Sequence, residues 1–239
     1  MADLNYFSIA ESTHDFQNPT TADKLRLAAD YLDVTAGDSV LDVGSRRGWW
    51  AVELAGRGAA VTGLELNPDF AVAAGLRAER AGVEVRTVVG PALEFAPEPG
   101  SYDVVTCLGA TFALEGYRPA LAWMTEAVRE GGRIAVGELH TADPGVEPDD
   151  DVPSLTELVH IAEEHGVEIT GMVSACVDDW DRYESLHWAN VHRWARANPD
   201  DPRRAEIVAL CRDYQSDYLT NTRGLLGWTI LVGVRTPGR

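Results

Sequence analysis

Short apolar runs alternate with amphipathic stretches from Ser39 to Glu138, and this pattern restricts the fold more than any other feature of the sequence. Apolar runs of strand length lie at 39–43, 60–65, 83–89, 102–108 and, after a glycine turn, within 131–138. Helical patterns occupy 20–34, 49–56, 68–80 and 119–130. Strands and helices that alternate through short connections form a parallel sheet with helices on both faces. The carboxyl ends of these strands meet at one edge of the sheet, and ligands bind at that edge.

The last third of the chain does not follow this alternating pattern. A helix is predicted over 154–165, a strand over 167–174 and a final strand over 226–235. Between the last two strands, residues 178–223 form a polar, aromatic-rich stretch of helical character. The alternating character of the final strand is typical of a sheet edge. Since no flexible linker divides the chain, we predict one α/β domain that carries a helical insertion at roughly 178–223.

The charge of the chain excludes several classes of partner. Its 239 residues include 20 basic and 38 acidic side chains, which gives a formal net charge of -18. A field of that sign repels nucleic acid and anionic lipid headgroups, so we expect neither nucleic acid nor membrane as a partner. No apolar segment approaches the ~18 residues of a membrane span, and the amino terminus lacks a basic start followed by an apolar stretch. We therefore expect a cytoplasmic protein.

A glycine loop joins the strand at 39–43 to the helix at 49–56. It reads V40-L-D-V-G-S-R-R-G48, and its two glycines let backbone N–H groups approach a ligand closely. The GxGxxG pattern of NAD-binding loops does not fit this segment. Instead, Asp42 lies just before the first glycine and Glu65 ends the second strand. A carboxylate at that strand end accepts both hydroxyl hydrogens of a ribose, although a solvated loop acid is the alternative for Glu65.

Four segments resemble, in order and spacing, the class I S-adenosylmethionine (SAM) dependent methyltransferases. They are V40-L-D-V-G-S-x-x-G48, V61-T-G-L-E-L-N-P68, S101-Y-D-V-V-T-C-L-G-A110 and G131-G-R-I-A-V-G-E138, and the resemblance spans residues 36–140. It implies a doubly wound, mostly parallel, seven-stranded Rossmann-like sheet. In that fold the last strand is antiparallel and the helical insertion precedes it.

Two further segments resemble a bacterial small-molecule subgroup of that family. They are H14-D-F-Q-N-P19 and D179-W-D-R-Y-E-S-L-H-W188. The resemblance implies a single SAM-binding domain over residues 1–239 with three parts. Residues 1–35 form an N-terminal lid and helix, residues 36–140 form the cofactor-binding core, and residues 178–223 form a helical cover over the substrate.

The resemblance also assigns a set of cofactor-binding residues by position. The glycine loop would surround the methionine part of SAM, Glu65 would bind the ribose, and the floor near the sulfonium would follow the fourth strand. The set is Asp42, Gly44, Ser45, Arg46, Gly48, Glu65, Leu66, Pro91, Ala92, Gly109 and Ala110. Two members depart from the family pattern, because Arg46 replaces a glycine and Pro91 replaces an acid that often binds adenine. A requirement for positive φ at this position would make Arg46 an obstacle to binding. Alternatively, its guanidinium pairs with the carboxylate of SAM or of a substrate.

Candidate catalytic groups lie at the strand ends and in the lid. Glu138 and His140 end the fifth strand on the same side, and His140 is the preferred general base because an imidazole ordinarily titrates near neutral pH. His14 is the third candidate, through the lid. Alternatively, His140 is an ordinary residue at the start of a loop, and His14 is an N-terminal residue without a catalytic role.

Candidate substrate contacts come from the fourth strand end and the insertion. They are Thr111, Tyr183, His187 and Trp188. On a helix, Trp180, His187 and Trp188 would point roughly together. A plain turn role is the alternative for Thr111, and packing of helices onto the sheet is the alternative for the aromatic side chains. The three cysteines are far apart and odd in number, and no cluster has metal-ligand spacing, so we predict no metal.

These features together predict a SAM-dependent methyltransferase that acts on a small molecule at an O, N or C atom and yields S-adenosylhomocysteine (SAH). The subgroup implies a bacterial enzyme of secondary metabolism. Two alternatives stay open: an enzyme that cyclises or cleaves SAM without methyl transfer, and a non-catalytic SAM-binding protein. An NAD-type or other nucleotide ligand has less support. The sequence leaves open whether the chain forms a homo-oligomer.

Overall fold

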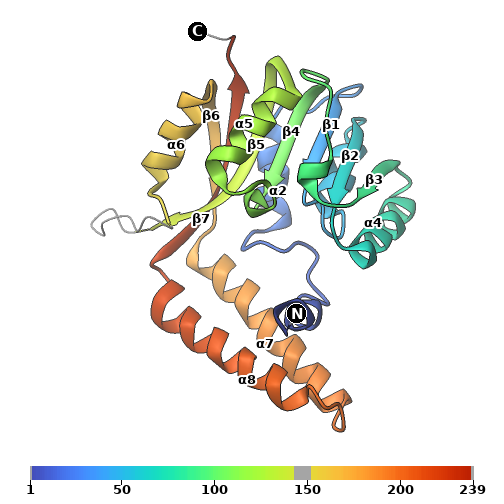
Figure 1. Ribbon diagram of the computed structural model, residues 1–239, viewed down its shortest axis with the longest axis vertical. Helices are drawn as coiled ribbons and strands as arrows, with labels where there is room; N and C mark the ends of the chain where they lie inside the picture. The colour runs from blue at the N-terminus through green and yellow to red at the C-terminus, as the bar shows by residue number, and fades with distance from the viewer. Residues whose placement is uncertain (1, 143–151, 238–239) are drawn as a thin grey trace.

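The computed structural model describes residues 2–142 and 152–237 and shows a seven-stranded sheet flanked by helices (Figure 1). The strand order is β3-β2-β1-β4-β5-β7-β6. The strands are β1 Ser39–Val43, β2 Ala60–Glu65, β3 Val85–Val89, β4 Tyr102–Leu108, β5 Val128–Thr141, β6 Val167–Ser174 and β7 Leu226–Arg235. β7 pairs antiparallel with both β5 and β6, whereas every pair among β1 to β5 is parallel. The predicted doubly wound, mostly parallel sheet with an antiparallel last strand is therefore confirmed.

Helices cover both faces of the sheet and bury a separate core on each. The helices are α1 Ala2–Ala10, α2 Ala22–Tyr31, α3 Trp49–Gly56, α4 Pro68–Ala81, α5 Tyr117–Ala127, α6 Leu155–Glu164, α7 Val177–Ala197 and α8 Arg204–Asp217. One core joins α2 and α3 to the sheet, and the other joins α5 and α6 to its opposite face. Within the described residues, no helix combines the length and apolar character needed to cross a membrane.

Local signals in the sequence place several helix ends. Asn67 accepts a hydrogen bond from the backbone N–H of Asp69, Pro68 occupies the first turn of α4, and Gly82 ends that helix in the left-handed region. Thr21 caps α2 by accepting from the N–H of Lys24. These side chains satisfy N–H groups that a helix leaves without partners in its first turn, so boundaries that carry such residues are readable from sequence.

The final strand occupies the interior of the sheet, and the prediction of a sheet edge is wrong. β7 lies between β5 and β6 and is buried over most of its length. Its glycines are buried positions where neighbouring side chains come close to the backbone. A side chain at Gly227 would collide with the ring of His140, and a Cβ at Gly233 would lie 2.6 Å from Val167. Thr229, which is fully buried, hydrogen-bonds to His140 and Ser174.

A layer of three helices lies beneath the sheet in Figure 1 and consists of α1, α7 and α8. Sequence patterning did not reveal α1. Tyr6 and Ala10 of α1 form a small buried core with Val191 of α7 and with Ile207 and Cys211 of α8. The N-terminal segment is thus packed against an insertion that is more than 170 residues away in the chain. The hydrogen bond from Asn190 Nδ2 to the carbonyl of Ala10, 180 positions away, belongs to the same contact.

Candidate active site at the carboxyl edge of the sheet

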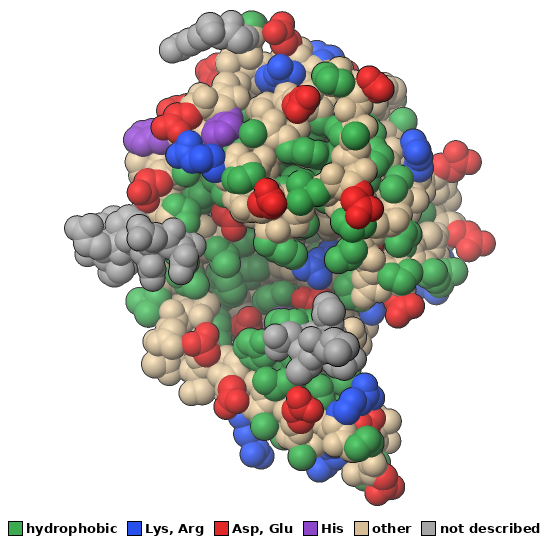
Figure 2. All heavy atoms as spheres, viewed as in Figure 1, with side chains coloured by type: hydrophobic (Ala, Val, Ile, Leu, Met, Phe, Trp, Pro, Cys, Tyr) green, Lys and Arg blue, Asp and Glu red, His purple; other side chains and the backbone are tan. Residues whose placement is uncertain are grey.

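A cavity of 410 Å³ lies between the carboxyl edge of the sheet and α1. Its walls come from the segments that follow β1, β2 and β4 and from one side of α1. The lining residues that the sequence also singled out are Gly44, Arg46, Glu65, Leu66, Ala92 and Ala110. Figure 2 shows a hollow between the sheet and the helical layer beneath it, with mainly hydrophobic side chains visible inside. The structure therefore brings together most of the expected cofactor-binding residues.

The glycine loop after β1 requires glycine at two points. Gly44 and Gly48 have φ angles of 71° and 75°, in the left-handed region that L side chains rarely adopt. A side chain at Gly44 would collide with Ala110 after β4, and a Cβ at Gly48 would lie 2.7 Å from that of Ala74. Ser45, between them, is buried and its hydroxyl has no hydrogen-bond partner. The loop is held tightly against two neighbouring segments, which fixes the direction of its N–H groups.

Arg46 adopts a φ of 52°, so its position in the loop does require the left-handed region. A non-glycine residue pays about 1–2 kcal/mol there. Its backbone N–H donates to Oε2 of Glu65 over 2.7 Å, and its guanidinium Nη1 lies 3.6 Å from Oε2 of Glu11. The loop thus tolerates the arginine, whose charged group is available at the cavity wall.

Glu65 is buried at the end of β2 with its carboxylate fixed by the backbone. Oε2 accepts from the N–H of Arg46 over 2.7 Å, and Oε1 accepts from the N–H of Asn67 over 2.8 Å. Each carboxylate oxygen has a second lone pair, so both remain able to accept a further hydrogen bond from a ligand in the cavity. The alternative of a solvated loop acid does not fit this burial, since only 5% of Glu65 is exposed.

Asp42 is buried beneath the glycine loop. Its Oδ1 accepts from the hydroxyl of Thr106 over 2.8 Å, and that hydroxyl accepts from the indole N–H of Trp50 over 3.1 Å. Burial raises the pKa of Asp42 to about 7, opposed by the Thr106 hydrogen bond and assisted by the nearby charge of Glu65. Oδ2 has no hydrogen-bond partner, and Asp42 lines a small cavity of 40 Å³ beside Ser45. A free buried acceptor of this kind favours a ligand that donates.

The remaining expected cofactor residues lie along the rim and floor. Leu66 is 67% exposed yet lines the cavity together with Ala92, whereas Pro91 is exposed and does not line it. Gly109, with a φ of 74°, lies so close to Asn18 that any side chain would collide with it. Asn18 in turn donates to the carbonyl of Leu108 over 3.0 Å, which ties the N-terminal segment to the end of β4.

His140 has no nitrogen available for proton transfer in this arrangement. Its Nδ1 lies 2.9 Å from the carbonyl of Thr141, which only accepts, so Nδ1 carries the hydrogen. Its Nε2 therefore accepts from the hydroxyl of Thr229 over 2.9 Å. Glu138 accepts a short hydrogen bond from the hydroxyl of Thr111 and another from the N–H of Leu139 over 2.9 Å. The geometry gives His140 a structural role in pairing β5 with β7.

His14 lies in a buried cluster that we name the lid cluster, formed by Glu11, His14, Tyr183 and His187. The rings of His14 and His187 have centroids 4.5 Å apart, and Tyr183 lies edge-on to both. His14 Nε2 donates to the carbonyl of Tyr183 over 3.2 Å, while its Nδ1 has no partner. Burial and then the neighbouring His187 lower the pKa of His14 to about 4, so this imidazole is neutral at neutral pH.

Glu11 is the member of the lid cluster that sequence reasoning missed. It is 4% exposed, its Oε1 accepts from the hydroxyl of Tyr183 over 3.4 Å, and its Oε2 faces Arg46. Burial raises its pKa, and Arg46 opposes that shift. The one signal in the sequence was its position three residues before His14. Through Glu11 the cofactor loop is connected to the helical insertion.

The aromatic residues of the insertion divide into two groups. His187 packs against His14 and Tyr183, whereas Trp180 and Trp188 both contact Tyr218, with ring centroids 6.5 Å and 5.9 Å from it. The prediction that Trp180, His187 and Trp188 point together is therefore wrong. His187 and Trp188 differ by about 100° around the helix and so face different neighbours. Trp180 and His187 lie on one side of α7 but about two turns apart along it, so they meet different segments.

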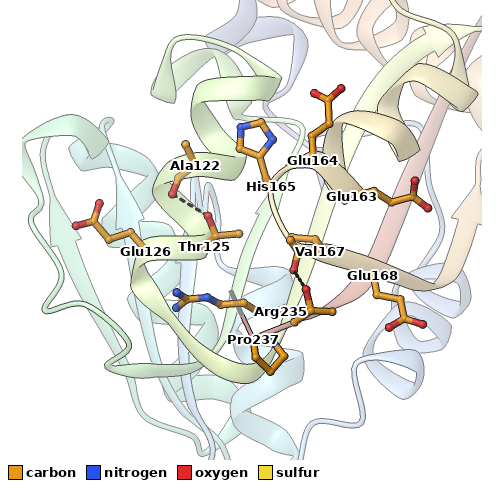
Figure 3. Close-up of a pocket in the computed structure, with 12 residues that line it drawn as sticks. Ala122, Thr125, Glu126, Glu163, Glu164, His165, Val167, Glu168, Arg235 and Pro237 are labelled. Atoms are coloured by element: carbon orange, nitrogen blue, oxygen red, sulfur yellow. Dashed lines mark hydrogen bonds between the residues drawn. The ribbon is translucent and has the colours of Figure 1, made fainter. Parts of the chain in front are cut away.

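A larger hollow lies away from this edge. It has a volume of 880 Å³, is open, and is bordered by α5, α6 and the end of β7 (Figure 3). Figure 3 shows Glu126 pointing away from Glu163, Glu164 and Glu168, so its acidic side chains do not converge on one point. No group of described residues has an arrangement that would hold a metal ion. The candidate functional residues lie at the smaller cavity instead.

Comparisons with known proteins agree with this geometry. A family model described as a methyltransferase domain matches residues 40–132. The uncharacterized protein YjhP of Escherichia coli K12 is 30% identical over 240 residues, which cover 94% of this chain and 95% of that protein. The crystal structure of a SAM-dependent methyltransferase from Geobacter sulfurreducens in complex with SAH superposes with a TM-score of 0.89 at 32% identity, covering 96% of this chain and 97% of that one. A ubiquinone biosynthesis O-methyltransferase from Saccharophagus degradans is 36% identical over 112 residues, or 45% of this chain and 48% of that enzyme.

Proposed function

The chain belongs to the class I SAM-dependent methyltransferases, and we propose that its acceptor is a small molecule methylated at an O, N or C atom. The observation that carries the proposal is the helical layer over the active edge. α1 roofs the cavity through Phe7 and Ser8, and α1 is itself packed against α7 and α8. A roofed cavity of 410 Å³ is in the range of sites for small ligands. The net charge of -18 disfavours nucleic acid as the acceptor.

The residues at the cavity fit SAM, which is the cofactor of this family. Glu65 offers two fixed carboxylate oxygens for the ribose hydroxyls, and Leu66 and Ala92 offer apolar contacts for the adenine. The free Oδ2 of Asp42 would accept from the ammonium group of the methionine part. When bound, SAM supplies an electrophilic methyl group on a sulfonium, and SAH is the neutral leaving group.

We assign the loop residues to the same cofactor. Gly44, Ser45 and Gly48 would surround the methionine part, with Gly109 and Ala110 at the floor near the reacting methyl group. The guanidinium of Arg46 would bind the methionine carboxylate, since a carboxylate and a guanidinium form strong charge-assisted hydrogen bonds. Pro91 would not contact the adenine, because it is exposed outside the cavity.

Among the three expected catalytic residues, we propose His14 as the proton acceptor. It is the one whose ring has a nitrogen without a hydrogen-bond partner, and this position in the lid cluster is what supports the assignment. Its lowered pKa leaves that nitrogen unprotonated at neutral pH and makes it a weak base. Both nitrogens of His140 are engaged, so we assign it no proton transfer. Glu138 would orient the hydroxyl of Thr111, and Tyr183, His187 and Trp188 would belong to the walls around the acceptor.

The three parts expected along the chain support the same function. We propose that residues 1–35 act as a lid, residues 36–140 hold the cofactor and residues 178–223 cover the acceptor, within one domain over 1–239. The packing of α1 on α7 and α8, and the bond from Asn18 to the carbonyl of Leu108, support a lid that reaches the cofactor floor.

Calorimetry with SAH tests the cofactor assignment. We expect the protein to bind SAH, and Glu65→Gln to weaken binding by at least about tenfold because the amide nitrogen cannot accept a ribose hydroxyl. The matched control is Glu130→Gln, an exposed glutamate in β5. Absence of SAH binding by the folded protein would refute the proposal. Methylthioadenosine formed from SAM without any acceptor would instead indicate cleavage of SAM.

A further inference from the structure

Three buried atoms of the lid cluster have no hydrogen-bond partner. They are Oε2 of Glu11, Nδ1 of His14 and Nε2 of His187. Each of the three residues is 4% exposed, so bulk solvent does not reach these atoms. Unpaired polar atoms are rare in protein interiors, and several in one place indicate a site that a ligand completes.

The partners of the two rings show that all three unpaired atoms are hydrogen-bond acceptors. Nε2 of His14 faces the carbonyl of Tyr183 at 3.2 Å, and a carbonyl only accepts, so the hydrogen is on Nε2 and Nδ1 carries a lone pair. Nδ1 of His187 lies 3.4 Å from a carboxylate oxygen of Glu184, which in the neutral ring places the hydrogen on Nδ1 and a lone pair on Nε2. The third atom, Oε2 of Glu11, also accepts, but it already lies 3.6 Å from Nη1 of Arg46. A ligand that completes the two ring nitrogens must therefore donate.

We propose that the acceptor presents a primary amino group to the lid cluster, with one N–H directed at Nδ1 of His14 and the other at Nε2 of His187. This inference rests on the methyltransferase function proposed above. The two rings are neighbours, with centroids 4.5 Å apart, so one small group is able to lie within reach of both. With both N–H groups held by lone pairs, the lone pair of the amine nitrogen is left free to face the methyl donor.

Other acceptor classes satisfy the cluster less well. A hydroxyl has one hydrogen, so it would leave one ring nitrogen unpaired, and a carbon nucleophile would leave both unpaired. A tertiary amine has no N–H in its nucleophilic form. A site that is built to receive hydrogen bonds discriminates strongly against analogues that lack the donor.

The surroundings also favour the product of amine methylation. As the N–C bond forms and the methyl–sulfur bond breaks, the electron pair of that bond stays on sulfur and the nitrogen becomes positively charged. The product is a protonated secondary amine, which leaves the site with the charge on nitrogen. The carboxylate of Glu11 and the ring of Tyr183 stabilise the positive charge, and the neutral imidazole of His14 does not repel it.

Access to the cluster requires movement of the N-terminal segment. The unpaired atoms are buried where residues 11–18 pack on α7, so an amine reaches them only when this segment moves away. The contacts of Tyr183 in this packing are long: its carbonyl lies 3.2 Å from His14 and its hydroxyl 3.4 Å from Glu11. Asn190 holds the same segment through shorter hydrogen bonds, to Thr13 over 2.9 Å and to the carbonyl of Ala10 over 2.7 Å.

The test measures binding to SAH-saturated protein by calorimetry, without turnover. The probes are butylamine, benzylamine and 2-phenylethylamine, each with its matched alcohol and its N,N-dimethyl derivative. We expect at least one primary amine to bind about tenfold or more tightly than both matched compounds. We further expect His187→Phe, which keeps a planar ring beside Tyr183, to weaken that amine by about tenfold while the Kd of SAH changes less than about twofold.

Controls separate the amine site from the fold and from the cofactor site. His192→Phe alters an exposed histidine on the same helix and should leave both dissociation constants unchanged. The inference is overturned if SAH binds but no primary amine does, if amines and alcohols bind alike, or if His187→Phe has no effect on the amine. Failure of the wild-type protein to bind SAH at all is a separate result, which removes the proposed function and this inference with it.

Discussion

Arg46 combines two roles at one position of the cofactor loop. Its backbone adopts the left-handed region and donates to Glu65, while its guanidinium lies between the cavity and Glu11. Because glycine relieves the strained φ, we expect Arg46→Gly to change the free energy of unfolding by no more than about 1 kcal/mol. We expect the affinity for SAH to fall about tenfold through loss of the carboxylate contact. Denaturant unfolding and calorimetry on the same samples measure the two effects.

An unchanged affinity for SAH in Arg46→Gly would contradict this assignment. If Arg46→Gly binds SAH as tightly as the wild type, the guanidinium does not contact the cofactor and serves only to pair with Glu11. Arg57→Gln is the matched control, since Arg57 pairs with Asp30 on the far side of α3 over 2.7 Å and should leave SAH binding unchanged.

At Asp42 we expect opposite effects of one substitution on stability and on cofactor binding. Its pKa is raised to about 7, above its ordinary value of 3.8, so its contribution to stability is complete below about pH 4 and is lost as the pH rises through 7. We therefore expect Asp42→Asn to match the wild type near pH 4 and to be more stable at pH 8, by roughly 1–3 kcal/mol. SAH affinity should fall in the same variant. Unfolding curves from pH 4 to 8 test the sign, and a variant that is less stable at pH 8 would contradict it.

The residues that line the cavity at the carboxyl edge were largely predictable, and of the lid cluster only Glu11 was not among the predicted residues. Gly44 and Glu65 lie within one strand-helix-strand unit, formed by β1, α3 and β2, whose spacing is fixed by local geometry, so a pattern in the sequence specifies them. The lid cluster joins Glu11 and His14 to side chains more than 160 positions away, and no local pattern reports such contacts. His140 was favoured by its usual pKa, but its two hydrogen bonds are tertiary.

At the scale of elements, α7 is anchored at its first turn by Asp179. This buried carboxylate accepts from the N–H of Cys176 over 2.9 Å, from Arg182 over 3.1 Å and, in a short ion pair, from Lys24 of α2. Burial alone would raise the pKa of Asp179, but these hydrogen bonds lower it to about 2. The insertion is thereby tied to the sheet layer through α2.

Asp179→Asn should loosen that anchor. We expect a loss of roughly 2 kcal/mol in the free energy of unfolding at pH 7, because hydrogen bonds to a charged group are removed. Since the folded pKa is depressed, the stabilisation is present above about pH 4 and is lost as the pH falls toward 2, so wild type and variant should converge there. Asp178→Asn, at an exposed neighbouring position, is the control and should change little. Equal stability of all three proteins at pH 7 would argue against the anchor.

Element boundaries followed from the sequence where a side chain or a glycine marks them. α4 begins at Pro68 after the Asn67 cap and ends before Gly82, as predicted. β7 was misplaced because glycine and threonine within a strand look like exposed positions, although here they admit close neighbours in the interior. α1 carries no cap signal or clear apolar face in its sequence, since its buried residues Tyr6 and Ala10 depend on partners from the insertion.

At the scale of the whole molecule, the two layers are coupled through α1. One side of α1 lines the cofactor cavity with Phe7 and Ser8, and another packs on α7 and α8 through Tyr6 and Ala10. A ligand that contacts α1 therefore restricts the helices of the lower layer, since binding to the native state opposes local opening. The cavity and the helices α7 and α8 are in this way linked through α1.

Hydrogen exchange tests this coupling. We expect saturating SAH to slow amide exchange in α1 and α7 by about tenfold or more, in addition to the loop at 44–48. Tyr6→Ala removes a ring that stacks on Tyr214 with a centroid separation of 4.8 Å, and it should keep SAH binding while losing the protection of α7. Protection confined to the loop in the wild type, or protection of α7 that survives Tyr6→Ala, would show that the layers respond to the cofactor independently. Slow exchange in both layers that depends on Tyr6 would mean that cofactor binding prepares the lid cluster before the acceptor arrives.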